Sequence, residues 1–343
     1  MVLGLLLPFL ALFGLAGYLH IYPALDADSL YIPELWARLI AGGSLGTWWL
    51  PPNTSLWPDL VLWHATHWLQ EGVLERLQLY GLAMGWALLW FTARLLRALG
   101  VQGFWQSLSL SATGLILGMV LAPAGAVFVW LAPAHQGIVV VAALWLWSLV
   151  LEPEMEARDW KSWLSLMLCL GLLLSSHRLL VPIALSSAIW LSFRSGSRKG
   201  FKFGPRGRLW LAILLSLSLA EALRFWLLST GVKVPIFPWK GFVGHLGQQL
   251  MGFNSSLPTL TKDVGLLGAV TVVGIVLWAA MAVKERGSWT WTLVAWFLSL
   301  VGALAVGLMM GSLALRYLLL PLWLPVLLLP TCFVRLWPRS ASS

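Results

Sequence analysis

Long apolar runs, separated by short polar connections, dominate the chain. About ten of them approach the length that an α-helix needs to cross a hydrocarbon core of about 30 Å. The runs cover residues 2–19, 77–93, 104–121, 138–151, 162–175, 179–193, 209–228, 264–283, 289–310 and 317–334. Because they are continuous and do not alternate with polar residues, a transmembrane β-barrel is excluded. The pattern predicts an all-α, polytopic integral membrane protein with one transmembrane domain over residues 1–343.

A long polar stretch, residues 20–76, interrupts this pattern directly after the first apolar run. Within it, residues 33–40 are predicted to form an amphipathic surface helix, because Pro33 suits the first helical position and the glycines that follow the segment end a helix. Residues 57–75 are predicted as a second, partly embedded helical piece. A second polar loop is predicted over residues 229–263.

Composition supports the membrane class and narrows the partners. The chain is 59% hydrophobic and only 10% charged, whereas a soluble domain carries roughly 25% charged residues. Its net charge of +9 does not indicate nucleic-acid binding, because the basic residues concentrate between apolar runs, as the positive-inside rule predicts. Membrane lipids are therefore the expected partners. Cys169 and Cys332 lie within apolar runs, which indicates packing thiols and no disulfide framework.

The charge distribution also predicts a topology. With a cytoplasmic N-terminus, most basic connections fall on the cytoplasmic side. These are Arg94, Arg97, the cluster at 194–208, Lys284, Arg286, Arg335 and Arg339. The connection 152–161 is net acidic, but acidic residues count little in this rule. The opposite face is then expected to collect the long loop, His135, the tip at His177 and Arg178, the 229–263 loop and Arg316.

Three acidic residues of the long loop are candidates for chemistry. Asp26 and Asp28 follow the first apolar run, and ionisable groups at membrane depth tend to face cavities and to be functional. Such a carboxylate can act as a general base on a hydroxyl or bind a divalent cation. The alternative interpretation is a solvated loop or a helix N-cap. Asp59, in the sequence LWPDL, has the same two interpretations.

Four positively charged or hydrogen-bond-donating residues on the same predicted face complement the carboxylates. They are His135, His177, Arg178 and Arg316. Taken singly, each is better explained as a side chain that snorkels to the headgroups. Together they predict a pocket for a lipid phosphate, which the planar fork of an arginine is well suited to bind.

Two further residue spacings are weaker indications of a functional site. His64, His67 and Glu71 share one face of a helix and resemble a metal-binding pattern. No third histidine accompanies them, whereas catalytic zinc usually takes three protein ligands, so we assign no metal site and leave a divalent metal open. Glu221 and Arg224 are spaced to pair on one helix.

Several short motifs resemble the GT-C superfamily of membrane glycosyltransferases. They are LDADSLY at 25–31, WPDL at 57–60, PAHQG at 133–137, SSHRLL at 175–180 and RYLLLPLWLP at 316–325. The resemblance implies a large first external loop with a catalytic acidic residue and amphipathic surface helices. The chain departs from it in carrying only Asp26-Ala-Asp28 for a paired acidic motif, and a histidine at 177 where an acidic residue is expected.

The resemblance also implies a mechanism and a location. Asp26 or Asp28, with Asp59 as a further candidate, would deprotonate an acceptor hydroxyl. Arg178 and Arg316, with His177 and His135, would stabilise the leaving polyprenyl phosphate, and the 229–263 loop would close over the site. The expected location is a bacterial inner membrane, with the active face external. Alternatives are a catalytically silent assembly subunit and a lipid or solute transporter. The sugar, the acceptor and the oligomeric state are not predicted.

Overall fold

The computed structural model has an all-α architecture. It describes residues 2–21, 27–44, 46, 55–122, 131–133, 137–152, 159–178, 180–185, 205–233, 239–311 and 318–337. The α-helices are α1 (Val2–Ile21), α2 (Ala27–Ile40), α3 (Val61–His67), α4 (Val73–Ala98), α5 (Phe104–Leu121), α7 (Gly137–Leu151), α8 (Trp160–Ser176), α10 (Pro205–Ser229), α11 (Trp239–Glu285), α12 (Ser288–Met309) and α13 (Leu319–Leu336). Two short π-helical turns, η2 (Leu56–Leu60) and η4 (Val181–Leu185), complete the described elements.

Within the part of the chain that the structure describes, six helical segments are long and apolar enough to cross a membrane. They are Val73–Ala98, Phe104–Leu121, Arg208–Ser229, Val264–Glu285, Ser288–Met309 and Leu319–Leu336. The predicted run 179–193 is described only as far as residue 185, and every other predicted run coincides with a described helix. The all-α class is therefore confirmed, and the six long apolar helices are typical of a polytopic membrane protein.

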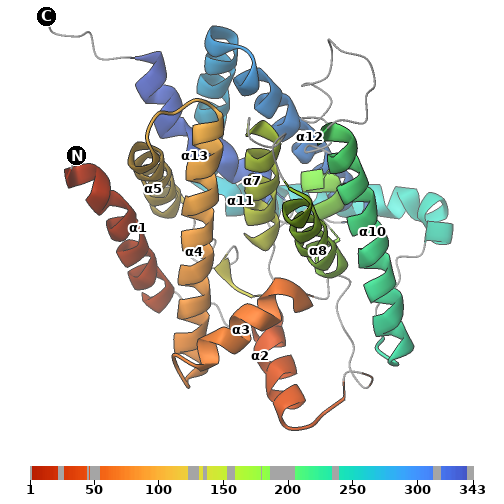
Figure 1. The fold of residues 1–343 in the computed structure, drawn as a ribbon. Helices are drawn as coiled ribbons and strands as arrows, with labels where there is room; N and C mark the ends of the chain where they lie inside the picture. The colour runs from red at the N-terminus through yellow and green to blue at the C-terminus, as the bar shows by residue number, and fades with distance from the viewer. Residues whose placement is uncertain are drawn as a thin grey trace, which may run out of the picture.

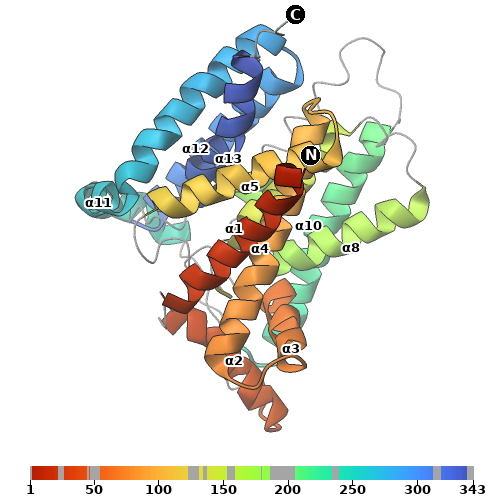
Figure 2. The ribbon, with the colours of Figure 1, turned by 90° about the vertical axis from the view of Figure 1, so that its left-hand side faces the viewer.

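The helices pack into one bundle, in which α4 and α13 each contact several other helices. Helix α4 packs against α1, α5 and α7, while α13 packs against α5 and α11, and α8 pairs with α10. Figure 2 shows α11, α12 and α13 together on one side of the bundle, with α8 and α10 on the other. In Figure 1, α3 lies across the lower end of the bundle and α2 projects downward beyond it.

Helix α13 contains Pro325 and Pro330 and is nevertheless buried. A proline has no N–H, so Pro325 leaves the carbonyl of Pro321, one turn earlier, without its helical partner. The indole Nε1 of Trp296, on α12, donates to that carbonyl at 2.8 Å. The Oγ1 of Thr271, on α11, donates to the neighbouring Leu322 carbonyl at 2.9 Å. Neighbouring helices thus satisfy backbone groups in an apolar interior, where an unpaired group is costly.

We expect Trp296→Phe to lower the free energy of unfolding by about 1–3 kcal/mol, since it leaves the buried Pro321 carbonyl without this hydrogen bond. Trp226→Phe is the matched control, because Trp226 is exposed on α10. Thermal unfolding of both variants in one detergent measures the difference. Equal midpoints would show that the hydrogen bond from Trp296 does not stabilise α13.

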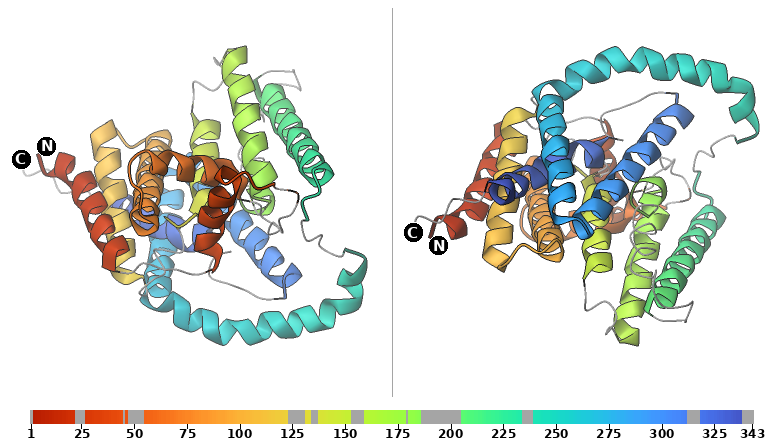
Figure 3. Two further views of the ribbon diagram at one scale, coloured as in Figure 1. Left: turned by 90° about the horizontal axis from the view of Figure 1, so that it is seen from below. Right: turned by 90° about the horizontal axis from the view of Figure 1, so that it is seen from above.

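Three predicted elements differ in the structure. Helix α2 begins at Ala27 instead of Pro33, and the predicted piece 57–75 is divided into η2, α3 and the first turn of α4. The second part of the predicted loop 229–263 is helical and forms the first part of α11, which begins at Trp239 and has a break at Gly265, where φ is +48°. Figure 3 shows this first part of α11 curving around one side of the molecule.

Candidate functional site

The polar residues at the helix ends gather at two opposite ends of the bundle. At one of them, which we call the basic end, Arg94 donates to Glu152 at 2.8 Å, and Trp289 Nε1 donates to the Leu99 carbonyl at 3.0 Å. These contacts bring together the last residues of α4 and α7 and the first turn of α12. Arg97, Lys284, Arg286 and Arg335 also lie at this end.

The opposite end, which we call the loop end, carries α2, α3 and the tip after α8. The N–H of Ser55 donates to the Ser176 carbonyl at 3.3 Å. Gly46 packs closely against the carbonyl of Thr230. The first loop, the tip at residue 177 and the start of the 229–263 segment therefore share one end, as the charge pattern predicts.

A buried carboxylate lies at the centre of the loop end. Asp59, on η2, has no exposed surface. The phenol of Tyr80, on α4, donates a hydrogen bond to Oδ1 of Asp59. The other carboxylate oxygen of Asp59, Oδ2, lies 3.5 Å from Nε2 of His177, which follows α8. Three elements that are distant in sequence thus contribute one polar cluster, Asp59, Tyr80 and His177, which we call the Asp59 cluster.

Backbone contacts to the end of α8 hold this cluster together. The N–H of Trp57 donates to Oγ of Ser176 at 2.9 Å, and the Ser55 contact to the Ser176 carbonyl lies beside it. These bonds fix η2 against the last turn of α8. They place Asp59 next to the residue that follows Ser176, which is His177.

The electrostatics of His177 follow from its burial. Burial lowers the pKa of His177 to about 3 and outweighs a backbone hydrogen-bond contribution from Trp57, which raises it. The imidazole is therefore neutral at pH 7. Neither ring nitrogen has a hydrogen-bond partner of normal geometry in the described structure. A neutral imidazole beside a buried carboxylate can exchange a proton once an acceptor hydroxyl enters between them.

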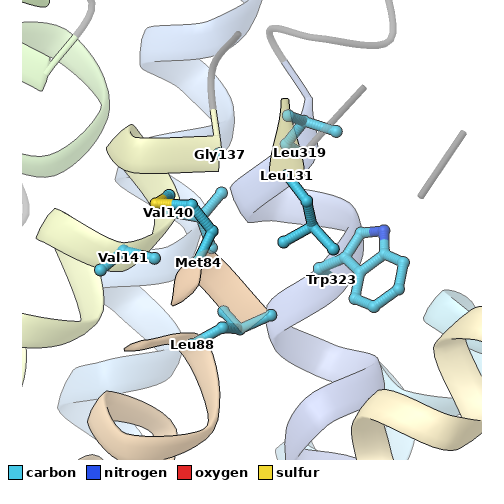
Figure 4. A pocket seen from close by; sticks show the side chains of 8 residues that line it. All are labelled: Met84, Leu88, Leu131, Gly137, Val140, Val141, Leu319 and Trp323. Atoms are coloured by element: carbon cyan, nitrogen blue, oxygen red, sulfur yellow. The ribbon is translucent and has the colours of Figure 1, made fainter. Parts of the chain in front are cut away.

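An apolar cavity lies on the same face of α4. Tyr80, Met84 and Leu88 occupy successive turns of this face. The cavity is lined by Met84, Leu88, Leu131, Gly137, Val140, Val141, Leu319 and Trp323 (Figure 4). Its volume of about 20 Å³ is close to that of a single water site, and its lining is apolar, so we expect it to be dry. It is too small to be the substrate site.

The other predicted site residues are not part of the Asp59 cluster as described. Asp26, His135 and Arg316 lie outside the described residues, as does the side chain of Asp28. Arg178 is exposed, and its Nη2 lies 3.2 Å from Oε1 of Glu221 on α10. Glu221 therefore reaches across to the tip after α8, and the predicted pairing with Arg224 on the same helix is not the contact that the structure gives it.

The three residues of the possible metal-binding pattern, His64, His67 and Glu71, do not lie on one helix. Helix α3 ends at His67, so Glu71 does not share its face. Nδ1 of His64 instead accepts a hydrogen bond from Nε1 of Trp36 at 3.0 Å. No group of three or more His, Cys, Asp or Glu side chains suited to a metal ion occurs among the described residues.

Sequence reasoning missed Tyr80 as a member of the Asp59 cluster and Ser176 as the residue that holds η2 beside it. Tyr80 lies in an apolar run and Ser176 at the end of another. The available signal was weak: a buried phenol needs a partner for its O–H, but the sequence does not say which.

No family model matches the chain, and neither the curated proteins nor the solved structures contain a match.

Proposed function

We propose that this chain is a membrane glycosyltransferase that moves a sugar from a polyprenyl-phosphate donor to a hydroxyl acceptor, with Asp59 as the general base. The observation that carries the proposal is the buried Asp59 carboxylate beside His177. Asp59 belongs to the loop between α1 and α4. The resemblance to GT-C enzymes implies that the catalytic acidic residue belongs to this loop.

The proposed reaction balances without a metal or a redox partner. The acceptor O–H gives its proton to the Asp59 carboxylate while its oxygen forms the new bond to the anomeric carbon of the sugar. The bond from that carbon to the phosphate oxygen breaks, and the polyprenyl phosphate leaves with the electron pair. Attack from the face opposite the leaving group inverts the configuration of the sugar.

The burial of Asp59 sets a condition on this mechanism. Because no part of Asp59 is exposed, an acceptor reaches it only after η2 separates from the end of α8. The contacts to break are the hydrogen bonds from Ser55 and Trp57 to Ser176. Lid and loop motions of this kind commonly accompany substrate binding in enzymes.

The same burial also favours a second candidate function, a catalytically silent assembly subunit with this fold. In that case Asp59 serves only to hold the first loop against α4 and α8 through Tyr80 and His177. A buried polar cluster can have such an anchoring role without any chemistry.

The experiment that separates the two functions measures polyprenyl phosphate released from short-chain polyprenyl-phosphate sugars by the purified chain in lipid vesicles. The panel contains hexosyl and pentosyl donors and is run with membrane extract as the source of acceptors. We expect release that depends on both donor and acceptor. A chain that releases nothing from any donor, while remaining folded, would be the silent subunit.

A further inference from the structure

A second polar feature of the loop end does not belong to the Asp59 cluster. Arg76, in the first turn of α4, is only 4% exposed. Its guanidinium carbon lies 4.0 Å from the ring centre of Trp63 and 4.4 Å from that of Trp36. The cation is thus held between two indoles, one from α3 and one from α2. Such contacts to ring faces are favourable for an arginine.

The guanidinium group is only partly satisfied. Nη2 donates to the Trp63 carbonyl at 2.9 Å, and Nε is 3.3 Å from Oγ1 of Thr66. An arginine has five N–H donors, so three have no partner among the described residues. The neighbouring acids Glu34, Glu71 and Glu75 are exposed, and no described carboxylate forms an ion pair with Arg76. A buried charge without a counter-ion is costly, which favours an anion at this site.

The surroundings of Arg76 indicate which anion it meets. The turn between α3 and α4 exposes apolar side chains, with Trp68 79% and Leu69 70% exposed, followed by Val73 and Leu74. An exposed apolar turn at the end of a membrane bundle is typical of the headgroup level, where tryptophan is enriched. The anion abundant at that level is phosphate, and the planar fork of an arginine matches two phosphate oxygens.

Arg76 lies one helical turn away from the Asp59 cluster along both of the segments that carry it. Trp63 lies one turn after Asp59, and Arg76 lies one turn before Tyr80. Trp63 contacts Arg76 one turn along from the place where Asp59 contacts Tyr80. Both contacts join η2 and α3 to α4.

We infer that Arg76, held against Trp36 and Trp63 with three of its five N–H donors without a partner among the described residues, is a binding site for a phosphate group, either of an anionic lipid or of free phosphate. The site needs no reaction at Asp59, and its test reads binding in the absence of any sugar donor. Its failure is therefore distinct from a failure of the proposed glycosyl transfer.

The test compares three probes on the full-length chain in neutral detergent. They are dihexanoyl phosphatidic acid, dihexanoylglycerol, which has the same chains and no phosphate, and inorganic phosphate. We expect the phosphatidic acid to bind the wild-type chain and Arg76→Gln to weaken it by about tenfold to 100-fold, the range of a hydrogen-bonded charge. Dihexanoylglycerol should be unaffected by the substitution. Isothermal titration calorimetry gives the affinities.

Two further variants control the result. Arg97→Gln removes an exposed arginine from the other end of the same helix and should leave binding unchanged. Arg76→Lys keeps the charge but loses the fork and the stacking, so it should bind between the wild type and Arg76→Gln; it replaces Arg76→Gln if that variant does not fold. Inorganic phosphate that binds and depends on Arg76 would identify a site for free phosphate, whereas binding of the lipid alone would identify a headgroup site.

Three results would overturn the inference. The wild-type chain could bind neither phosphatidic acid nor inorganic phosphate. Arg76→Gln could retain wild-type affinity. Arg97→Gln could lose as much affinity as Arg76→Gln, which would indicate general attraction to a basic protein.

Discussion

Replacing Asp59 with asparagine is expected to reduce sugar transfer by about 100-fold to 10,000-fold, the usual contribution of a general base. Asparagine has nearly the same shape as aspartate and keeps an oxygen that can accept from Tyr80. It cannot take a proton from an acceptor hydroxyl. The substitution therefore removes the proposed chemistry while it preserves most of the packing around η2.

The measurement pairs the initial rate of polyprenyl phosphate release with the thermal unfolding midpoint. Asp159→Asn is the matched control, because Asp159 is an exposed N-cap of α8 that accepts from the Ser162 N–H, and asparagine caps a helix equally well. We expect Asp59→Asn to unfold near the wild-type temperature with its transfer lost, and Asp159→Asn to keep both properties.

A companion variant, Asp59→Ala, tests the anchoring role of the same residue. It removes the hydrogen-bond acceptor of the Tyr80 phenol, so this buried hydroxyl loses its partner. We expect a destabilisation of about 1–3 kcal/mol, the cost of leaving a buried donor without its hydrogen-bond partner. If Asp59→Asn transfers sugar within about tenfold of the wild-type rate, Asp59 is an anchor and not a base. The base would then be sought at Asp26 or Asp28.

Much of the fold follows from the sequence because each membrane-length apolar run forms its hydrogen bonds within itself. The bounds of α5, α7 and α12 differ from the predicted runs by a residue at most. The sharing of one end by the first loop and the His177 tip was also predictable. This prediction requires only that successive membrane-spanning helices alternate in direction and that the basic residues identify the connections on one side.

The parts that were not predictable depend on contacts between distant segments. The segment from Trp239 to Gly265 is rich in polar residues and glycine, so it has no membrane-length apolar run and reads as a loop. It is helical in the structure, and Gly252 within it packs on the backbone of Gly311 after α12. Arg76 likewise reads as the boundary residue of an apolar run. Its burial depends on indoles supplied by α2 and α3.

The Asp59 cluster shows the same limit. Asp59 and His177 were both candidates in the sequence, but they were assigned to different roles, one as a base and the other as a phosphate-binding group. Their proximity results from the packing of η2 between α4 and the end of α8. The position of His177 relative to Asp59 therefore depends on the contacts that hold the end of α8 and the following turn in place.

One of those contacts is made by Gly302, and its replacement by leucine is the second large effect that we expect. Gly302, on α12, packs directly on the backbone of η4: a Cβ added there would overlap the Pro182 carbonyl oxygen and lie 2.8 Å from its carbonyl carbon. Because backbone atoms cannot move aside as a side chain can, α12 and η4 must separate. We expect Gly302→Leu to lower the free energy of unfolding by about 3 kcal/mol or more, the upper range for overpacking.

The effect should extend to the site. Leu180 donates to the His177 carbonyl at 3.0 Å and Val181 to that of Arg178 at 3.0 Å, so a shift of η4 moves His177 relative to Asp59. A displacement of about 1 Å can cost about 100-fold in rate. Gly17→Leu is the matched control, because a Cβ on Gly17 of α1 meets nothing within 4 Å. If Gly302→Leu unfolds no earlier than Gly17→Leu, α12 does not support η4, and the position of His177 must be held by the Ser176 contacts alone.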